Sequence, residues 1–181
     1  MSPQSTVVVR TTYFGGIGPV ADPDPADVVL GVVRKPHSFV EDVVDRNVPE
    51  VAPPDDLLHA VKRVEKAAEA DGVPNPREVA WSSTSFAESY QRFLERTGVK
   101  DAIRDLREEA VDGAGDLWLV CYERDPAWCH RRLLADAIVD DVPLARVHHH
   151  PEPGVDADAG DAGGSGVPGD AALTDFQGES A

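Results

Sequence analysis

One segment, residues 117–132, constrains the fold more than any other part of the chain. Leu117 to Val120 is a short apolar run, typical of a strand buried on both faces of a sheet. Asp125 suits the cap of a helix and Pro126 its first position, and apolar residues at helical spacing continue to Ile138. The segment therefore predicts a buried strand followed by a helix, as in an α/β protein with a small, mostly parallel sheet flanked by helices.

Reactive side chains gather where this strand meets this helix. Both cysteines of the chain lie here, Cys121 and Cys129, together with Glu123, His130 and Arg131. Open α/β sheets bind ligands beyond the carboxyl ends of their strands. A position in the first helical turn would favour a Cys129 thiolate, because the helix dipole stabilises negative charge there. The segment predicts an anion-binding site, although Cys121 also fits the alternative of a small buried core residue.

A metal site is not expected from the same residues. Cys121, Cys129 and His130 are residue types that bind zinc. However, adjacent residues of a helix point about 100° apart, so Cys129 and His130 should not reach one ion. The spacing also lacks the closely paired cysteines of a zinc ribbon. A disulfide between the two cysteines is sterically feasible, but a cytosolic chain keeps its thiols reduced.

The order of these residues resembles the signature of the domain of unknown function 488 family. That signature is an apolar strand, a Cys-x-Glu pattern, and a Cys-His-Arg triplet that opens a helix. The matching positions are Cys121, Glu123, Cys129, His130 and Arg131. The resemblance extends over residues 6–150 and implies an α/β domain there, while the function of the family is unsettled. One departure is Val33, where many relatives have an aspartate.

Weaker matches to the same family supply further candidate residues. They are Tyr13 in a turn after the first strand, Arg34 and Ser38 in an Arg-x-Pro-x-Ser pattern, Tyr90 in a later helix, and His148 at the end of the last strand. Arg34 also suits phosphate or carboxylate recognition, because its guanidinium forms two parallel hydrogen bonds. Ser38 and Tyr90 have structural alternatives, a helix cap and a core tyrosine respectively.

The remaining elements follow from hydrophobic periodicity. Strands are predicted at residues 7–12, 28–33, 79–81 and 144–148, and helices at 39–47, 56–70, 85–96, 100–111 and 126–139. The first helix would start at a capping box formed by Ser38 and Glu41. The strands at 117–120 and 144–148 are expected to form a parallel pair across their connecting helix. Residues 151–181 contain seven glycines, seven acidic residues and no Lys or Arg, which predicts a disordered tail after one domain at 6–150.

The charge of the chain bears on its setting and its partners. Its formal net charge is −16, and only four of its 17 basic residues are lysines. This acidic, lysine-poor composition is typical of proteins from a high-salt cytoplasm. It does not support nucleic-acid binding at ordinary salt, although the argument weakens in molar salt. The N-terminus lacks a signal-peptide pattern and no apolar run is long enough for a membrane span, so we expect a cytoplasmic location.

Two main hypotheses and one further alternative follow for the function. In the first, the protein is an enzyme acting on a phosphate- or sugar-containing, nucleotide-like small molecule. Glu123, Cys129 and His130 would be catalytic, while Arg34, Arg131, Cys121, Tyr13, Ser38, Tyr90 and His148 would bind the substrate. Either Glu123 and His130 act as acid and base, which we slightly favour, or Cys129 is a nucleophile. In the second, the same site binds a nucleotide or small anion without turnover. A thiol redox role is the further alternative, and the sequence names no cofactor and predicts no oligomeric state.

Overall fold

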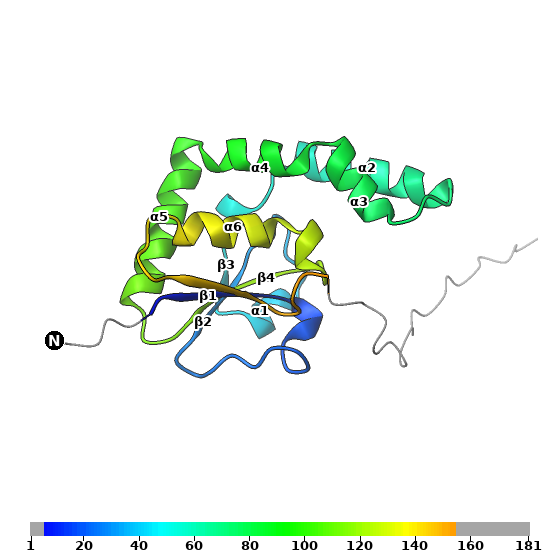
Figure 1. Cartoon of the computed structure of the whole chain (residues 1–181). Coiled ribbons are helices and arrows are strands. Elements are labelled where there is room, and N and C mark those ends of the chain that lie inside the picture. Colours follow the sequence, from blue (N-terminus) through cyan, green and yellow to red (C-terminus); the bar gives the residue numbers. More distant parts are fainter. Residues whose placement is uncertain (1–5, 155–181) are drawn as a thin grey trace, which may run out of the picture.

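A computed structural model describes residues 6–154, which form a parallel sheet covered mainly on one face (Figure 1). The sheet has five strands in the order β3-β2-β4-β1-β5, and every neighbouring pair is parallel. The strands are β1 (Val8–Tyr13), β2 (Val28–Gly31), β3 (Arg46–Asn47), β4 (Leu117–Cys121) and β5 (Arg146–His149). This architecture confirms the predicted α/β class. Of the predicted disordered tail, residues 155–181 lie outside the described part.

The helices divide between the two faces unequally. They are α1 (Val40–Val43), α2 (Asp55–Ala70), α3 (Pro76–Ser83), α4 (Phe86–Leu94), α5 (Thr97–Asp112) and α6 (His130–Val139), with short 3-10 turns at η1 (Phe14–Gly16), η2 (Pro49–Val51) and η3 (Pro126–Trp128). In Figure 1, α6 lies directly on the sheet, α2, α3 and α4 form a layer beyond it, and α1 lies on the opposite side. None of the described helices has the length and apolar character that a bilayer crossing needs.

Strand β4 is the central strand of the sheet, and all five of its residues are buried. Its continuous apolar run suits a strand that is covered on both faces. Parallel pairing aligns its last residue, Cys121, with Tyr13 at the end of β1, and aligns Val120 with Gly31 at the end of β2. The turns that follow these three strands therefore meet at one edge of the sheet, where the predicted site should lie.

Two predicted elements are wrong, each because tertiary contacts override the local pattern. The predicted helix at 39–47 ends after Val43, since the Asp45 carboxylate accepts a hydrogen bond from Val29 N–H at 2.7 Å and residues 46–47 pair with β2. Its first turn has Phe39 at the cap position and no side-chain cap, so the predicted Ser38 capping box is also wrong. The predicted strand at 79–81 belongs to helix α3, which begins at Pro76.

The predicted pairing of the last two strands is wrong as well. Strands β4 and β5 flank helix α6 in the sequence, but they are not neighbours in the sheet. Strand β1 lies between them and pairs with both, through Thr11↔Leu119 on one side and Thr11↔His149 on the other. The N-terminal strand β1 thus occupies the position beside β4 in which β5 was predicted.

The side chain of Asn47 fixes the segment that leaves β2 and leads to Arg34. Its Oδ1 accepts a hydrogen bond from Val33 N–H at 3.2 Å, and its Nδ2 donates one to Val33 O at 2.9 Å. Gly31 leaves room for this contact, because a Cβ there would lie 2.8 Å from Asn47 Oδ1. One side chain therefore satisfies both backbone groups of a buried residue directly before Arg34.

We predict that Asn47→Ala lowers the free energy of unfolding by about 1–3 kcal/mol, because it leaves the N–H and C=O of Val33 without their partner. Urea denaturation of wild type and variant measures the difference. Gln91→Ala, at an exposed position of α4, is the control and should change stability by no more than about 0.5 kcal/mol. A loss in Asn47→Ala as small as that of the control would contradict the assigned role.

Candidate functional site

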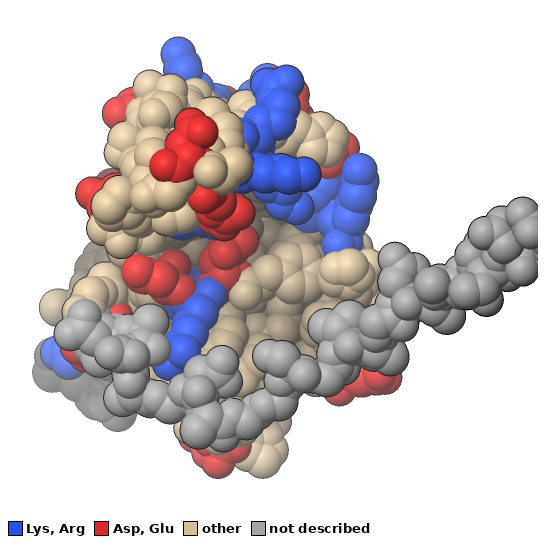
Figure 2. Space-filling model, turned by 90° about the vertical axis from the view of Figure 1, so that its right-hand side faces the viewer, with Lys and Arg blue, Asp and Glu red and all other residues tan. Residues whose placement is uncertain are grey.

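A cavity of about 170 Å³ opens at the edge where the strands β2 and β4 end. Both cysteines and His130 line it, together with four aromatic side chains, those of Trp81, Phe86, Tyr122 and Trp128. Four cations and two carboxylates also line it: Arg34, Lys35, Lys62, Arg77, Asp55 and Glu123. Figure 2 looks onto this end of the molecule and shows Lys and Arg side chains gathered on one side of a hollow lined mainly by uncharged residues. The cavity thus combines reactive, aromatic and cationic groups.

The backbone before helix α6 brings Cys129 and His130 to the same point. As predicted, the Asp125 carboxylate caps the turn that begins at Pro126, accepting a hydrogen bond from Ala127 N–H at 2.8 Å. The predicted position of Cys129 inside the first helical turn is wrong: the residue is extended, with φ −131° and ψ 138°, and caps α6. The 100° separation of adjacent helical side chains therefore does not apply to Cys129 and His130.

The ring of His130 lies between the two sulfurs and the sheet. Its Nδ1 is 3.8 Å from Cys121 Sγ and 3.9 Å from Cys129 Sγ, and its Nε2 is 2.8 Å from Val32 O. A carbonyl oxygen only accepts hydrogen bonds, so Nε2 must carry a proton. Consequently Nδ1 carries the lone pair of the neutral ring, and it faces the sulfurs.

Tyr90 lies behind this ring and does not line the cavity. Its hydroxyl donates a hydrogen bond to Val51 O at 2.6 Å, and its ring packs edge-on against that of His130, 5.5 Å between centroids. Burial raises the pKa of Tyr90 well above its ordinary value, and the neighbouring cysteines add to the effect, so the hydroxyl remains a donor. The structure thus gives Tyr90 the core position that was one of its two predicted alternatives, with a direct contact to His130.

The surroundings of the two cysteines shift their pKa values in opposite directions, which favours a thiolate at Cys129 and a thiol at Cys121. Burial disfavours a Cys129 thiolate, but a hydrogen bond from Cys121 and the charge of His130 outweigh it. With a further contribution from the Arg131 guanidinium, the pKa of Cys129 lies well below the ordinary thiol value. Conversely, the hydrogen bond to Cys129 and burial raise the pKa of Cys121 well above that value. Cys121 therefore keeps its proton.

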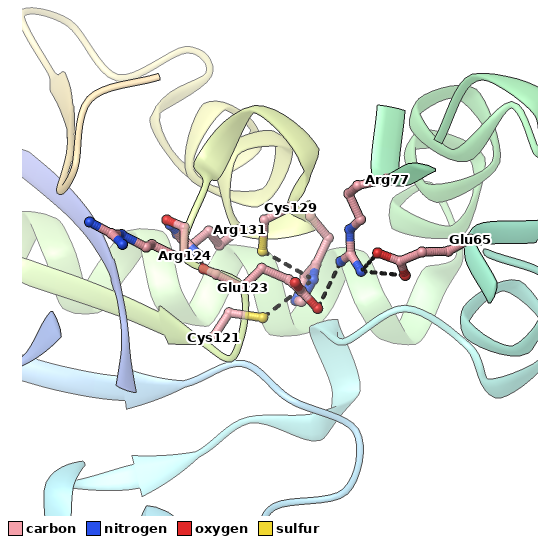
Figure 3. A network of polar contacts seen from close by, with 8 residues as sticks. Glu65, Arg77, Cys121, Glu123, Arg124, Cys129 and Arg131 are labelled. Carbon is pink, nitrogen blue, oxygen red and sulfur yellow. Dashed lines mark hydrogen bonds and ion pairs between the residues drawn. The ribbon is translucent and has the colours of Figure 1, made fainter. Parts of the chain in front are cut away.

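Glu123 is held at the rim of the cavity by an arginine from α3. Arg77 Nη2 lies 2.7 Å from Glu123 Oε1, and Arg77 Nη1 lies 2.9 Å from Glu65 Oε2, so one guanidinium bridges two carboxylates (Figure 3). Burial would lower the pKa of Arg77, but the charges of the two carboxylates raise it instead. The network fastens the turn after β4 to α2 and α3.

The two predicted anion-binding arginines occupy different places. Arg131 is fully buried and braces the turn after β4, because its Nη1 donates to Glu123 O and its Nη2 to Arg124 O, the latter at 2.8 Å. Arg34 lines the cavity, and its Nη2 and Nε donate to Ala52 O at 2.6 Å and to Pro53 O at 3.2 Å. Arg34 is therefore the arginine of this pair that a ligand in the cavity can reach.

Three other predicted site residues do not line the cavity. Tyr13 ends β1 beside Cys121, Ser38 is exposed before α1, and His148 is exposed on β5. In the histidine run it is His149 that contacts the sheet, with its Nδ1 2.8 Å from Thr11 Oγ1. A binding role for Tyr13, Ser38 or His148 stays a prediction that this geometry does not support.

Sequence reasoning missed the residues that α2 and α3 bring to the cavity. Lys62 comes from α2, and Arg77 and Trp81 come from α3. A signal existed for α3, because Pro76 suits the first position of a helix and residues 77 and 81, four apart, then share one helical face. No local pattern places α2 and α3 beside the turn after β4, since that is a long-range packing outcome.

Comparison with known proteins gives one match. A family model named DUF488-N3a, described as the active DUF488-N3 subclade, matches residues 20–141. No curated protein and no solved structure matches the chain. The matched range includes both cysteines, His130, and every other residue that lines the cavity.

We predict that iodoacetamide alkylates Cys129 in folded, reduced, chelator-treated protein with a midpoint pH well below about 8.5, the value of a free thiol. The rate should fall as the pH drops through the lowered pKa of Cys129, because the thiolate is lost there. Peptide mass spectrometry at a series of pH values measures the rate for each cysteine separately.

Two variants control this measurement. Cys129→Ser should remove the low-pH reaction, whereas Cys121→Ala should raise its midpoint, because the hydrogen bond that stabilises the thiolate is gone. A midpoint at or above about 8.5, or no reaction before unfolding, would contradict the assignment.

Proposed function

This chain belongs to the DUF488-N3a family, the active DUF488-N3 subclade, and from that premise we propose that it is an enzyme acting on a phosphate-bearing, nucleotide-like small molecule. The observation that carries the proposal is the cavity itself. It joins a floor of Cys121, Cys129 and His130 to aromatic walls and a cationic rim. Reactive groups at the strand ends of an α/β sheet, next to a pocket, are typical of enzyme sites.

The lining of the cavity matches the parts of a nucleotide. Trp81, Phe86 and Trp128 offer flat apolar surfaces to a base or another ring system. Arg34 and Lys62 lie on the same cavity and suit a phosphate group. The volume of about 170 Å³ favours one ring system inside, with the phosphate at the rim.

The positions of the side chains support Cys129 as the nucleophile rather than a Glu123–His130 acid–base pair. Both nitrogens of His130 are engaged, Nε2 with Val32 O and Nδ1 with the sulfurs, and Glu123 is paired with Arg77. In the proposed chemistry the Cys129 thiolate, whose proton has passed to His130 Nδ1, attacks an electrophilic atom of the bound ligand, and the bond from that atom to its leaving group breaks. The proton on His130 is then available to the leaving group.

The acidic, lysine-poor composition supports a high-salt cytoplasm as the setting of this activity. In concentrated salt the attraction between separated charges is screened within a few ångströms. Recognition of a phosphate must then rest on direct hydrogen bonds, which favours the half-buried Arg34 over the exposed lysines of the rim.

We predict that a nucleoside 5′-monophosphate binds more tightly than its nucleoside. Lys62→Met should weaken the affinity for the monophosphate by about two- to fivefold, as expected for an exposed ion pair, and leave the affinity for the nucleoside unchanged. Isothermal titration calorimetry across a panel of bases measures both affinities. Lys66→Met removes a lysine one helical turn further along α2, outside the cavity, and should change neither affinity. Equal effects of the two substitutions would contradict binding at this rim.

Turnover is tested with the tightest ligand of that panel. We expect product formation by wild type, with loss of at least about a hundredfold in rate in Cys129→Ser, because serine is a much weaker nucleophile without a strong base. Chromatography of the ligand and intact-protein mass spectrometry measure product and covalent adduct. If ligands bind but neither product nor adduct forms, the alternative of a non-catalytic nucleotide- or anion-binding module replaces the enzyme.

A further inference from the structure

We propose that Cys121, Cys129 and His130 form a binding site for one thiophilic divalent cation of the Zn²⁺ class, with its fourth coordination position open to the cavity. The inference goes beyond the proposed reaction, because it rests on the positions of three ligand atoms and not on any substrate. It also revises the expectation from the sequence that these residues cannot reach one ion.

The distances fit a tetrahedral ion. With bonds of about 2.3 Å to sulfur and 2.0–2.1 Å to nitrogen, tetrahedral angles place sulfur and nitrogen ligands about 3.6 Å apart and two sulfurs about 3.8 Å apart. The Nδ1 of His130 lies 3.8 and 3.9 Å from the two sulfurs, and the three ligand atoms all lie within 4.8 Å of one another. The two sulfur–nitrogen distances are within about 0.3 Å of the tetrahedral value, and the two sulfurs would have to approach each other by up to about 1 Å to complete three corners of the tetrahedron.

The surroundings of His130 prepare it as a ligand. A histidine that binds a metal usually donates its other ring N–H to a carbonyl or carboxylate, which fixes the tautomer and the ring orientation. Val32 O accepts that bond from Nε2 at 2.8 Å, and the ring of Tyr90 packs against the imidazole. The lone pair of Nδ1 is thereby directed at the space between the sulfurs.

Charge and burial are also consistent with a bound cation. All three residues are buried, with 1% of Cys129 and 6% of His130 exposed, so an ion here would lose most of its water. Two thiolates would neutralise a divalent charge, and soft sulfur ligands favour Zn²⁺ over Mg²⁺ or Ca²⁺. Because all three residues line the cavity, a water molecule or a ligand atom can supply the fourth donor.

Occupancy of this site has a direct consequence for Cys129. A coordinated sulfur shares one of its lone pairs with the ion, which lowers its reactivity towards an electrophile. Metal-loaded protein should therefore resist alkylation of Cys129, and a chelator should restore it. The cation would therefore slow a reaction that uses the free sulfur, which makes metal binding a means of regulating the site.

The test is a titration of reduced, chelator-treated protein, without an affinity tag that binds metals, with Co²⁺ under anaerobic conditions. We expect one equivalent to bind, with the sulfur-to-cobalt charge-transfer absorption and the visible bands of a tetrahedral site, and Zn²⁺ should displace the cobalt and bleach these bands. Cys121→Ser and Cys129→Ser should each weaken binding by at least about tenfold, as expected when a donor sulfur is lost. His59→Ala removes a histidine that lines the cavity outside the three proposed ligands, and should leave the spectrum unchanged.

Two results would overturn the proposal. One is the absence of a sulfur-to-cobalt charge-transfer band in wild type. The other is that both serine variants bind cobalt with the wild-type affinity and show the same bands. If a serine variant does not fold, wild-type protein alkylated at Cys129 after folding replaces it, and the proposal then requires that this protein bind cobalt at least about tenfold more weakly. These outcomes are independent of the proposed function when nucleotide binding and turnover are measured in chelator-treated protein.

Discussion

The hydrogen bond between His130 Nε2–H and Val32 O is the interaction on which the site depends. It joins the start of α6 to the segment after β2, and it leaves Nδ1 facing the two sulfurs at 3.8 and 3.9 Å. With Nε2 committed to a carbonyl, the ring can exchange a proton or share a lone pair only on the side of the cysteines. The proposed nucleophilic chemistry at Cys129 and the proposed metal binding by Cys121, Cys129 and His130 both depend on this single arrangement.

The surrounding contacts hold this arrangement in place at some cost in stability. Burying a polar group lowers the stability of the fold unless the group finds a hydrogen-bond partner, and burying a charged guanidinium has a desolvation cost even within a network. Arg131 is fully buried to brace the turn after β4, and Arg77 bridges Glu65 and Glu123 to fasten the same turn to the outer helices. An apolar core would serve folding equally well, so this concentration of polar contacts around two cysteines points to function.

The sequence predicts the part of the site that is local in the chain. The apolar run of β4, the Asp125 cap and Pro126 place Cys121, Cys129 and His130 at the end of a buried strand, as observed. It does not reveal that Cys129 is extended, because the chain between Pro126 and α6 forms a 3-10 turn and not the first turn of the helix. Nor does it show that Trp81 closes the cavity or that Asn47 pairs with Val33, since both depend on contacts between distant segments.

The most direct test of this account is the protonation pattern of the His130 ring, measured by ¹⁵N nuclear magnetic resonance in reduced, metal-free protein as the pH is varied. We predict that the neutral ring carries its proton on Nε2 and that, on adding Zn²⁺, Nδ1 becomes the coordinating nitrogen. A neutral ring with its proton on Nδ1 and none on Nε2 would contradict it, because the bond to Val32 O could not then exist and the lone pair would face away from the sulfurs.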